Sequence, residues 1–313
     1  MTAPDPHAVD PSDEGRHAAS EDPLWNESHY LDFVSVDGRL AGYARIGLYP
    51  NLGVTWWTTV VVGPDRPLVA SVAYDWPLPD RDLTIRGDGF SVHGDIDVPL
   101  DRLRLHGSAP ARVLDGPEGV YRGEEGTPVS LGFDLTWSTD GVPYQYAVTT
   151  RYEIPCLVGG TVTVGDETLA IDGEGQRDHS WGVRDWWAFG WCWFAGRLDD
   201  GTRIHGADIR IPGSRLPLGY VQHTATGVAT IEALDVTEEL GPFGMPTSAR
   251  ARIDPGGLDL AIEPLAYGPL VLTASDGRVS RFPRAQVRFT ATDGRRGTGW
   301  IEWNQPDPSM GGQ

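Results

Sequence analysis

The chain has 313 residues, of which 40% are hydrophobic, and its 44 acidic and 25 basic residues give a formal net charge of −19. This length and apolar content suit one or two globular domains, and no apolar run is long enough to cross a bilayer. Because nucleic acids and anionic membranes recruit basic surfaces, the acidic balance argues against nucleic-acid binding and membrane insertion.

The first 22 residues, MTAPDPHAVDPSDEGRHAASED, are polar and contain neither the basic start nor the apolar centre of a secretory signal. They predict a disordered tail over residues 1–22, followed by a folded protein of the cytoplasm. Residues 307–313 predict a second, short tail at the other end.

Short runs rich in β-branched and aromatic residues follow, and they alternate with turn signals. The runs at 54–62, 68–74, 144–154 and 161–164 are typical of strands, and the recurring Asp-Gly pairs are typical of tight turns. No long segment has a helical period, so the sequence predicts a mostly antiparallel, all-β protein. The segment 80–107 also alternates and is assigned to strands, although DVPLDRLRL within it also suits a helical turn.

The sequence PCLVGG at residues 155–160 marks a candidate boundary between two halves. Each half has the size of one antiparallel barrel, which predicts domains at 23–155 and 156–306. The two cysteines, Cys156 and Cys192, lie far apart and have no metal-ligand spacing. The nucleophile elbow, the phosphate-binding glycine loop and the H-E-x-x-H zinc motif do not occur in the sequence, so we expect neither a metal nor a cofactor.

The stretch GEGQRDHSWGVRDWWAFGWCWFAG at 173–196 contains a dense group of tryptophans. From residue 187 onward bulky aromatic side chains alternate with mostly smaller ones, and successive side chains of a strand point to opposite faces. The pattern predicts one aromatic face, which either lines a cavity or packs in the core. The candidate ligand-contacting residues are Trp181, Trp186, Trp187, Trp191 and Trp193.

The Asp-Gly pair at 200–201 predicts a hairpin that returns along this strand. A two-residue loop pairs Trp193 with Asp208 and Gly196 with His205. In that register Asp208 shares the aromatic face and His205 lies on the opposite face. A loop longer by one residue exchanges the two faces, and both residues are candidate ligand contacts.

A charged group stands beside the tryptophans. Arg177, Asp178 and His179 precede Trp181, and Arg184 follows it. Burial and neighbouring charges shift the pKa of a carboxyl or imidazole group, so Asp178 or His179 is the candidate proton donor, which the arginines would orient. The alternative is a structural ion-pair network that closes a barrel.

Three further acidic positions are weaker candidates. Glu153, just before the expected boundary, either reaches a cleft between the halves or pairs with an arginine such as Arg151. Glu27 and His29 are spaced to share a strand face, and Glu302 lies between two tryptophans of a late strand.

The motif G-x-G-x-R-D-H-S-W-G-x-R-D-W at Gly173–Trp186 resembles that of proteins related to AttH and carotenoid 1,2-hydratase (hydroxyneurosporene synthase). Residues 26–53 and the closing GTGWIEWN at 297–304 resemble the same family, so the resemblance spans most of 24–306. It implies two lipocalin-like β-barrels packed together, with a ligand pocket at a barrel mouth or between the barrels. Relatives include enzymes that hydrate isoprenoid double bonds, and proteins similar in fold catalyse cyclisations of polyenes. The hydratases' own motif is a near variant, so their substrate is not carried over.

Two functions fit these residues. The first is a cofactor-free enzyme that acts on an apolar isoprenoid, steroid or polyene-like substrate by acid-assisted hydration, isomerisation or cyclisation of a double bond. The indole faces would stabilise a developing cation. The second is a non-catalytic, lipocalin-like binding protein for an apolar small molecule. The titratable cluster favours the enzyme, and the sequence specifies neither the substrate nor the oligomeric state.

Overall fold

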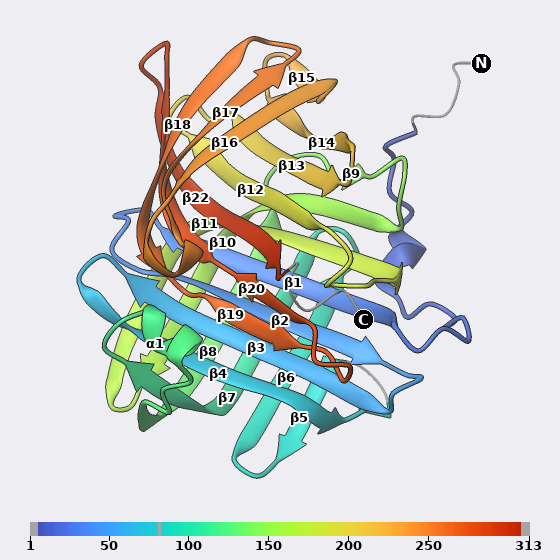
Figure 1. Ribbon diagram of the computed structural model, residues 1–313, viewed down its shortest axis with the longest axis vertical. Coiled ribbons are helices and arrows are strands. Elements are labelled where there is room, and N and C mark those ends of the chain that lie inside the picture. Colours follow the sequence, from blue (N-terminus) through green and yellow to red (C-terminus); the bar gives the residue numbers. More distant parts are fainter. Residues whose placement is uncertain (1–5, 81–82, 308–313) are drawn as a thin grey trace.

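The computed structural model describes residues 6–80 and 83–307 of the chain. Within these residues, 22 strands form two antiparallel sheets, together with one short α-helix and two short 3-10 segments (Figure 1). The expected all-β class is confirmed, because the protein consists of two curled antiparallel sheets packed against one another as in a double lipocalin-like fold.

The first sheet has the order β4-β3-β2-β1-β11-β10-β8-β7-β6-β5, and pairing of β4 with β7 closes it into a barrel. The short strand β9 pairs with β10, and helix α1 (Glu118–Arg122) lies between β7 and β8 in the chain. The strands are β1 (Trp25–Ser35), β2 (Ala41–Tyr49), β3 (Val54–Gly63), β4 (Arg66–Pro77), β5 (Leu83–Gly87), β6 (Phe90–Val98), β7 (Arg102–Leu114), β8 (Thr127–Thr139), β9 (Tyr144–Gln145), β10 (Arg151–Val164) and β11 (Glu167–Val183).

The second sheet has the order β15-β14-β13-β12-β22-β21-β18-β17-β16, and β19 pairs with β20, which in turn pairs with β22. The 3-10 segments are η1 (Pro11–Glu14), before β1, and η2 (Pro242–Gly244), between β16 and β17. The strands are β12 (Gly190–Leu198), β13 (Arg203–Ile211), β14 (Ser214–His223), β15 (Gly227–Thr230), β16 (Ala233–Leu240), β17 (Pro246–Asp254), β18 (Leu258–Tyr267), β19 (Leu270–Thr273), β20 (Val279–Phe282), β21 (Arg284–Ala291) and β22 (Arg296–Pro306).

The alternation of side chains along each strand produces three apolar layers. On β1, Leu31 and Phe33 point into the first barrel, whereas Tyr30 and Val34 point into a layer between the two sheets. On β12, Phe194 belongs to the core of the second sheet. In Figure 1, β12 and β22 pass over β1 and β11, so the outer faces of these strands enclose the middle layer.

The chain passes from the first sheet to the second between β11 and β12, across residues 184–189. The boundary expected at 155–156 falls inside β10, which pairs with β8 and β11 along most of its length. The glycines of PCLVGG do not mark a turn. Gly160 has a φ of +139°, and a Cβ there would lie 1.9 Å from the backbone oxygen of Asp134, so this glycine permits close approach of two strands.

The N-terminal segment from residue 6 to residue 22 lies against the first barrel rather than forming the expected disordered tail. Val9 packs against the first core, and the Asp10 side chain accepts a hydrogen bond from the backbone at the start of η1. Glu14 is buried and pairs with Arg177 inside the barrel. A buried ion pair thus holds the segment in place, while residues 1–5 and 308–313 lie outside the described residues.

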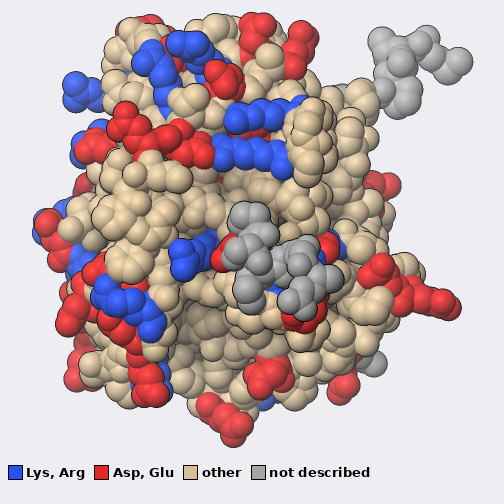
Figure 2. Space-filling view, in the orientation of Figure 1, with Lys and Arg blue, Asp and Glu red and all other residues tan. Residues whose placement is uncertain are grey.

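The ambiguous segment 80–107 forms β5, β6 and the start of β7, apart from residues 81–82, which lie outside the described part. The helical turn that DVPLDRLRL also suited is replaced by a turn between β6 and β7. Among the described residues no helix is long and apolar enough to cross a membrane. Figure 2 shows acidic and basic side chains in small mixed groups over one face of the molecule.

Candidate functional site

A pocket of about 340 Å³ lies in the layer between the two sheets. This volume is within the range of small-molecule sites, about 300–1,000 Å³. Its walls come from β1, β2 and β11 on one side and from β12, β13 and β14 on the other. Apolar side chains form one wall, among them Ile209, Leu216 and Leu218, and the exposed Val148 and Val183 also line the pocket.

The alternation of β11 separates the charged group that the sequence places together. Asp178 and Ser180 line the pocket, whereas Arg177 and His179 are buried on the opposite face of the strand, inside the first barrel. Of the four proposed catalytic residues, Asp178 and Arg184 therefore contact the pocket, and Arg177 and His179 do not.

On the pocket side, cross-strand pairing places further polar side chains beside Asp178. Tyr30 of β1 lies opposite both Asp178 of β11 and Arg45 of β2, and Glu153 of β10 lies opposite Asp178. Directly opposite residues of neighbouring strands have side chains on the same face. Four strands thus present Arg45, Tyr30, Asp178 and Glu153 in one row toward the second sheet.

Asp178 and Glu153 share one counter-ion, Arg151. Arg151 Nη2 donates to Asp178 at 2.8 Å, and Arg151 Nε donates to Glu153 at 2.8 Å. Burial, opposed by Arg151 and reinforced by the charge of Glu153, raises the pKa of Asp178 to about 7. Burial acts in the same way on Glu153, but Arg151 and further contacts hold the pKa of Glu153 below its ordinary value. Glu153 is therefore the carboxylate that keeps its charge, and Asp178 is the one that can carry a proton near neutral pH.

Behind the pocket wall, Glu153 and His205 form a buried network. Trp193 Nε1 donates to Glu153 at 3.0 Å, and His205 Nε2 lies 2.5 Å from the hydroxyl of Tyr146, which lines the pocket. Burial lowers the pKa of His205, and its Nδ1 lies 3.0 Å from the carbonyl oxygen of Phe194. The neutral ring therefore donates from Nδ1, and Nε2 accepts the Tyr146 hydroxyl proton.

The rings of Trp186, Trp191 and Trp193 line the pocket, whereas Trp181 borders it but its ring stacks on His17 and packs against the core of the first barrel. Trp187 does not line the pocket, because its Nε1 donates to the backbone oxygen of Leu272 at 3.1 Å and Arg278 covers its ring. The expected alternation from residue 187 fails at this point, since residues 184–189 connect the sheets and the strand begins only at Gly190.

The expected hairpin register is wrong by one residue. Leu198 bonds to Thr202, just before β13, which leaves a loop of three residues, Asp199 to Gly201. Cys192 therefore lies opposite Asp208, and Ala195 lies opposite His205. The two faces are thereby exchanged. His205 shares the face of Trp193, and Asp208 points into the second barrel.

Asp208 is held there by two arginines. Arg210 donates to its carboxylate at 3.0 Å and Arg215 at 2.9 Å. Asp208 is fully buried and lies outside the pocket, so its role as a ligand contact is not supported by its position.

Two arginines of the pocket, Arg45 and Arg284, were not among the candidates named from the sequence. Arg45 and Arg184 lie over the ring of Trp186, with 4.9 and 5.2 Å between the guanidinium carbon and the ring centroid. Burial, together with the positive charge of Arg151, lowers the pKa of Arg184 to about 10. Arg284 also lines the pocket and pairs with Glu302. Arg151 has a sequence signal, because it stands two residues before Glu153 on one strand, whereas Arg45 and Tyr146 have none.

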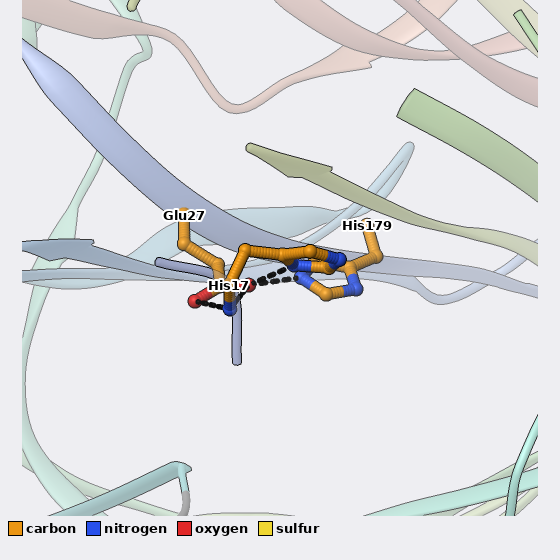
Figure 3. A group of neighbouring side chains, drawn as sticks. All are labelled: His17, Glu27 and His179. Atoms are coloured by element: carbon orange, nitrogen blue, oxygen red, sulfur yellow. Dashed lines mark hydrogen bonds and ion pairs between the residues drawn. The ribbon is translucent and has the colours of Figure 1, made fainter. Parts of the chain in front are cut away.

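A second polar cluster occupies the inside of the first barrel. Arg177 Nη1 donates to Glu14 at 2.6 Å, and the Tyr152 hydroxyl donates to the same oxygen. Beside them, Glu27 Oε1 lies 2.7 Å from His17 Nδ1 and 3.1 Å from His179 Nε2 (Figure 3). His17, Glu27 and His179 are the residues of the described chain whose donor atoms are grouped closely enough to hold a metal ion.

Fold and site together define a protein of two packed lipocalin-like sheets with a charged and aromatic pocket between them. The chain belongs to the family described as a domain of unknown function, DUF7064, which matches residues 10–307. No curated protein sequence matches the chain.

Three solved structures share this fold over almost the whole chain. An AttH-like protein from Nitrosomonas europaea is 16% identical, with a TM-score of 0.64 over 95% of this chain and 96% of that chain. Kievitone hydratase from Nectria haematococca is 12% identical, with a TM-score of 0.61 over 90% of this chain and 88% of that chain. CghA is 10% identical, with a TM-score of 0.59 over 93% of this chain and 90% of that chain. The resemblance to AttH-like proteins is thus confirmed at the level of the fold.

Proposed function

We propose that the protein is an enzyme that binds an apolar substrate in the pocket between the sheets and promotes acid-assisted hydration, isomerisation or cyclisation of a double bond. The observation that carries this proposal is the position of Asp178, whose carboxyl group lies on the polar wall formed by β1, β2 and β11, across the pocket from the indole rings and aliphatic side chains of β12, β13 and β14. A neighbour of the same fold is named as a hydratase, which is consistent with such chemistry.

In this reaction Asp178 transfers its proton to one carbon of the double bond, and a cation develops at the other carbon. The negative faces of Trp191 and Trp193 stabilise that charge. Water then adds and returns a proton to the Asp178 carboxylate, which gives hydration. Loss of a neighbouring proton to the same carboxylate gives isomerisation, and attack by a second double bond followed by proton loss gives cyclisation. Arg151 holds the carboxylate in place between transfers.

Arg45 and Arg184 favour a substrate that is not a pure hydrocarbon. Both guanidinium groups line the pocket at Trp186, and Arg184 makes no hydrogen bond or ion pair with another side chain in the described part of the chain. Guanidinium groups recognise carbonyl, carboxylate and phosphate oxygens. We therefore propose an isoprenoid, steroid or polyene-like substrate with an oxygen function at the Trp186 end of the pocket.

The test begins with mass spectrometry of the small molecules that co-purify with the protein. The compound found is then incubated with the protein in deuterium oxide, and the product is examined for deuterium on carbon. Wild type should incorporate deuterium, Asp178→Asn should not, and Asp134→Asn should behave as wild type, because Asp134 is an exposed carboxylate paired with Arg104.

Two outcomes contradict the proposal. Deuterium incorporation that persists in Asp178→Asn removes Asp178 as the proton donor. A compound that binds and is recovered unchanged, without deuterium, indicates the competing function of a non-catalytic binding protein for an apolar molecule.

A further inference from the structure

Three side chains from distant parts of the chain meet inside the first barrel, on the face of β11 opposite the pocket. His17 comes from the N-terminal segment, Glu27 from β1 and His179 from β11. One nitrogen of each imidazole points at the carboxylate in Figure 3, and the three ligand atoms lie within 4.8 Å of one another. In a tetrahedral zinc site with bonds of about 2.0–2.2 Å, ligand atoms are about 3.3 Å apart. Small shifts of these side chains are enough to accommodate an ion.

The outer hydrogen bonds of the two rings leave both inner nitrogens with a lone pair. His179 Nδ1 lies 3.3 Å from the Tyr152 hydroxyl, which gives its own proton to Glu14 and so accepts from the ring. His17 Nε2 lies 3.5 Å from the carboxylate of Asp13, which also can only accept.

With the outer nitrogens protonated, neutral rings direct lone pairs from His179 Nε2 and His17 Nδ1 at the Glu27 oxygen, only 3.1 and 2.7 Å away. In these tautomers three acceptor atoms converge on one point, and a metal ion among them would be bound by all three.

The surroundings are those of a metal site. Histidine ligands characteristically donate their second ring nitrogen to a carboxylate or similar group, which is the role that Asp13 and Tyr152 fill here. His179 and Glu27 are buried, whereas the side chain of His17 is 21% exposed and leaves a route from solvent. Trp181 stacks on the His17 ring at 3.7 Å between centroids and fixes its orientation.

We propose that His17, Glu27 and His179 bind one divalent transition-metal ion, with zinc as the best fit. Two imidazole nitrogens and one carboxylate oxygen suit zinc and related ions, whereas calcium and magnesium take oxygen ligands. The ion ties the N-terminal segment to β1 and β11. It lies on the barrel side of β11, so the proposal is independent of the chemistry assigned to Asp178.

The experiment uses the full chain without an affinity tag, stripped of metal with EDTA and then dialysed against a small excess of Zn²⁺ or Co²⁺. Wild type should retain one ion per chain by elemental analysis. The Co²⁺ form should show the visible absorption of nitrogen and oxygen ligation without a thiolate band, because Cys156 and Cys192 lie outside the group. His17→Ala should weaken binding by at least about 10-fold.

The matched control is His106→Ala, since His106 also pairs with an aspartate and lies next to another histidine, but on the surface. It should bind the ion as wild type does. Zn²⁺ should also raise the melting temperature of wild type and leave that of His17→Ala unchanged. Wild type that retains no ion overturns the proposal, as does equal binding by His17→Ala. If His17→Ala does not fold, the same measurements are made on Glu27→Gln, which should likewise bind the ion more weakly than wild type.

Discussion

The removal of the Glu14 carboxylate tests whether the N-terminal segment is an integral part of the fold. Glu14 is 3% exposed and Arg177 is 2% exposed, and 2.6 Å separates Glu14 Oε1 from Arg177 Nη1. Nε and Nη2 of Arg177 have no hydrogen-bond partner among the described residues, so Glu14 supplies the charge that compensates this guanidinium. Glu14→Ala leaves it buried and uncompensated.

Breaking a buried ion pair from one side costs about 3–5 kcal/mol. We therefore expect Glu14→Ala to lower the free energy of unfolding by about that amount, and most of the loss to disappear in the double variant with Arg177→Met, which leaves no buried charge. An exposed pair provides the control. Glu118 lies 3.5 Å from Arg122 on α1, and Glu118→Ala should cost less than about 1 kcal/mol.

The assay is urea unfolding in the presence of EDTA, followed by tryptophan fluorescence and far-ultraviolet circular dichroism. The double-mutant cycle isolates the interaction of the two side chains. The reasoning is refuted if Glu14→Ala lowers the free energy of unfolding no more than Glu118→Ala does. It is also refuted if Glu14→Ala lowers it by the same amount with arginine and with methionine at position 177.

Three further variants test the buried charge and the close packing of the two sheets. Burial raises the pKa of Asp32 well above its ordinary value, so the folded state binds this proton more tightly than the unfolded chain and loses stability as pH rises above about 4. The free energy of unfolding of Asp32→Asn should therefore exceed that of wild type at pH 8 by at least about 1 kcal/mol, and the two should be equal near pH 3. A variant that is less stable than wild type at pH 8 would contradict this expectation. Gly299→Ala places a Cβ 2.0 Å from a backbone oxygen of β12 and should separate β12 from β22. The control Gly159→Ala should be tolerated, because the nearest atom to its Cβ is 4.0 Å away. Melting curves followed by circular dichroism compare the two variants. Trp193→Phe removes the indole donor of the buried Glu153 carboxylate and should cost about 1.5–3 kcal/mol in urea unfolding, so an unchanged midpoint would exclude a stabilising role for this bond.

The candidate site was predictable only as far as local patterns reach. The strand that carries Trp191 and Trp193 follows from its alternation, and both rings line the pocket. The same period predicts that Asp178 and His179 point to opposite faces once β11 is known to be a continuous strand. The sequence analysis treated them as one cluster because they are neighbours in the chain, whereas β11 continues beyond both of them and directs their side chains to opposite faces.

Other residues of the site have no local signal. Arg45 lies in the same row as Asp178 because both pair with Tyr30 of β1. In the separate cluster inside the first barrel, His17 and His179 come from segments that are far apart in the chain. The expectation of no metal rested on short spacing motifs, which do not test a group of side chains from three separate segments such as the one proposed above. The disordered tail was predicted from composition, and composition contains no information about the ion pair that Glu14 forms with the distant Arg177.

The sequence by itself therefore determined the all-β class, many of the strands and the aromatic character of β12. The tertiary structure decided the sheet that each strand joins, the register of the β12–β13 hairpin and the grouping of the polar side chains. The physical reason is that side-chain alternation is a property of neighbouring residues, whereas pairing is a property of distant ones. A single extra residue in the loop at Asp199 to Gly201 was enough to exchange His205 and Asp208 between the pocket side and the barrel core.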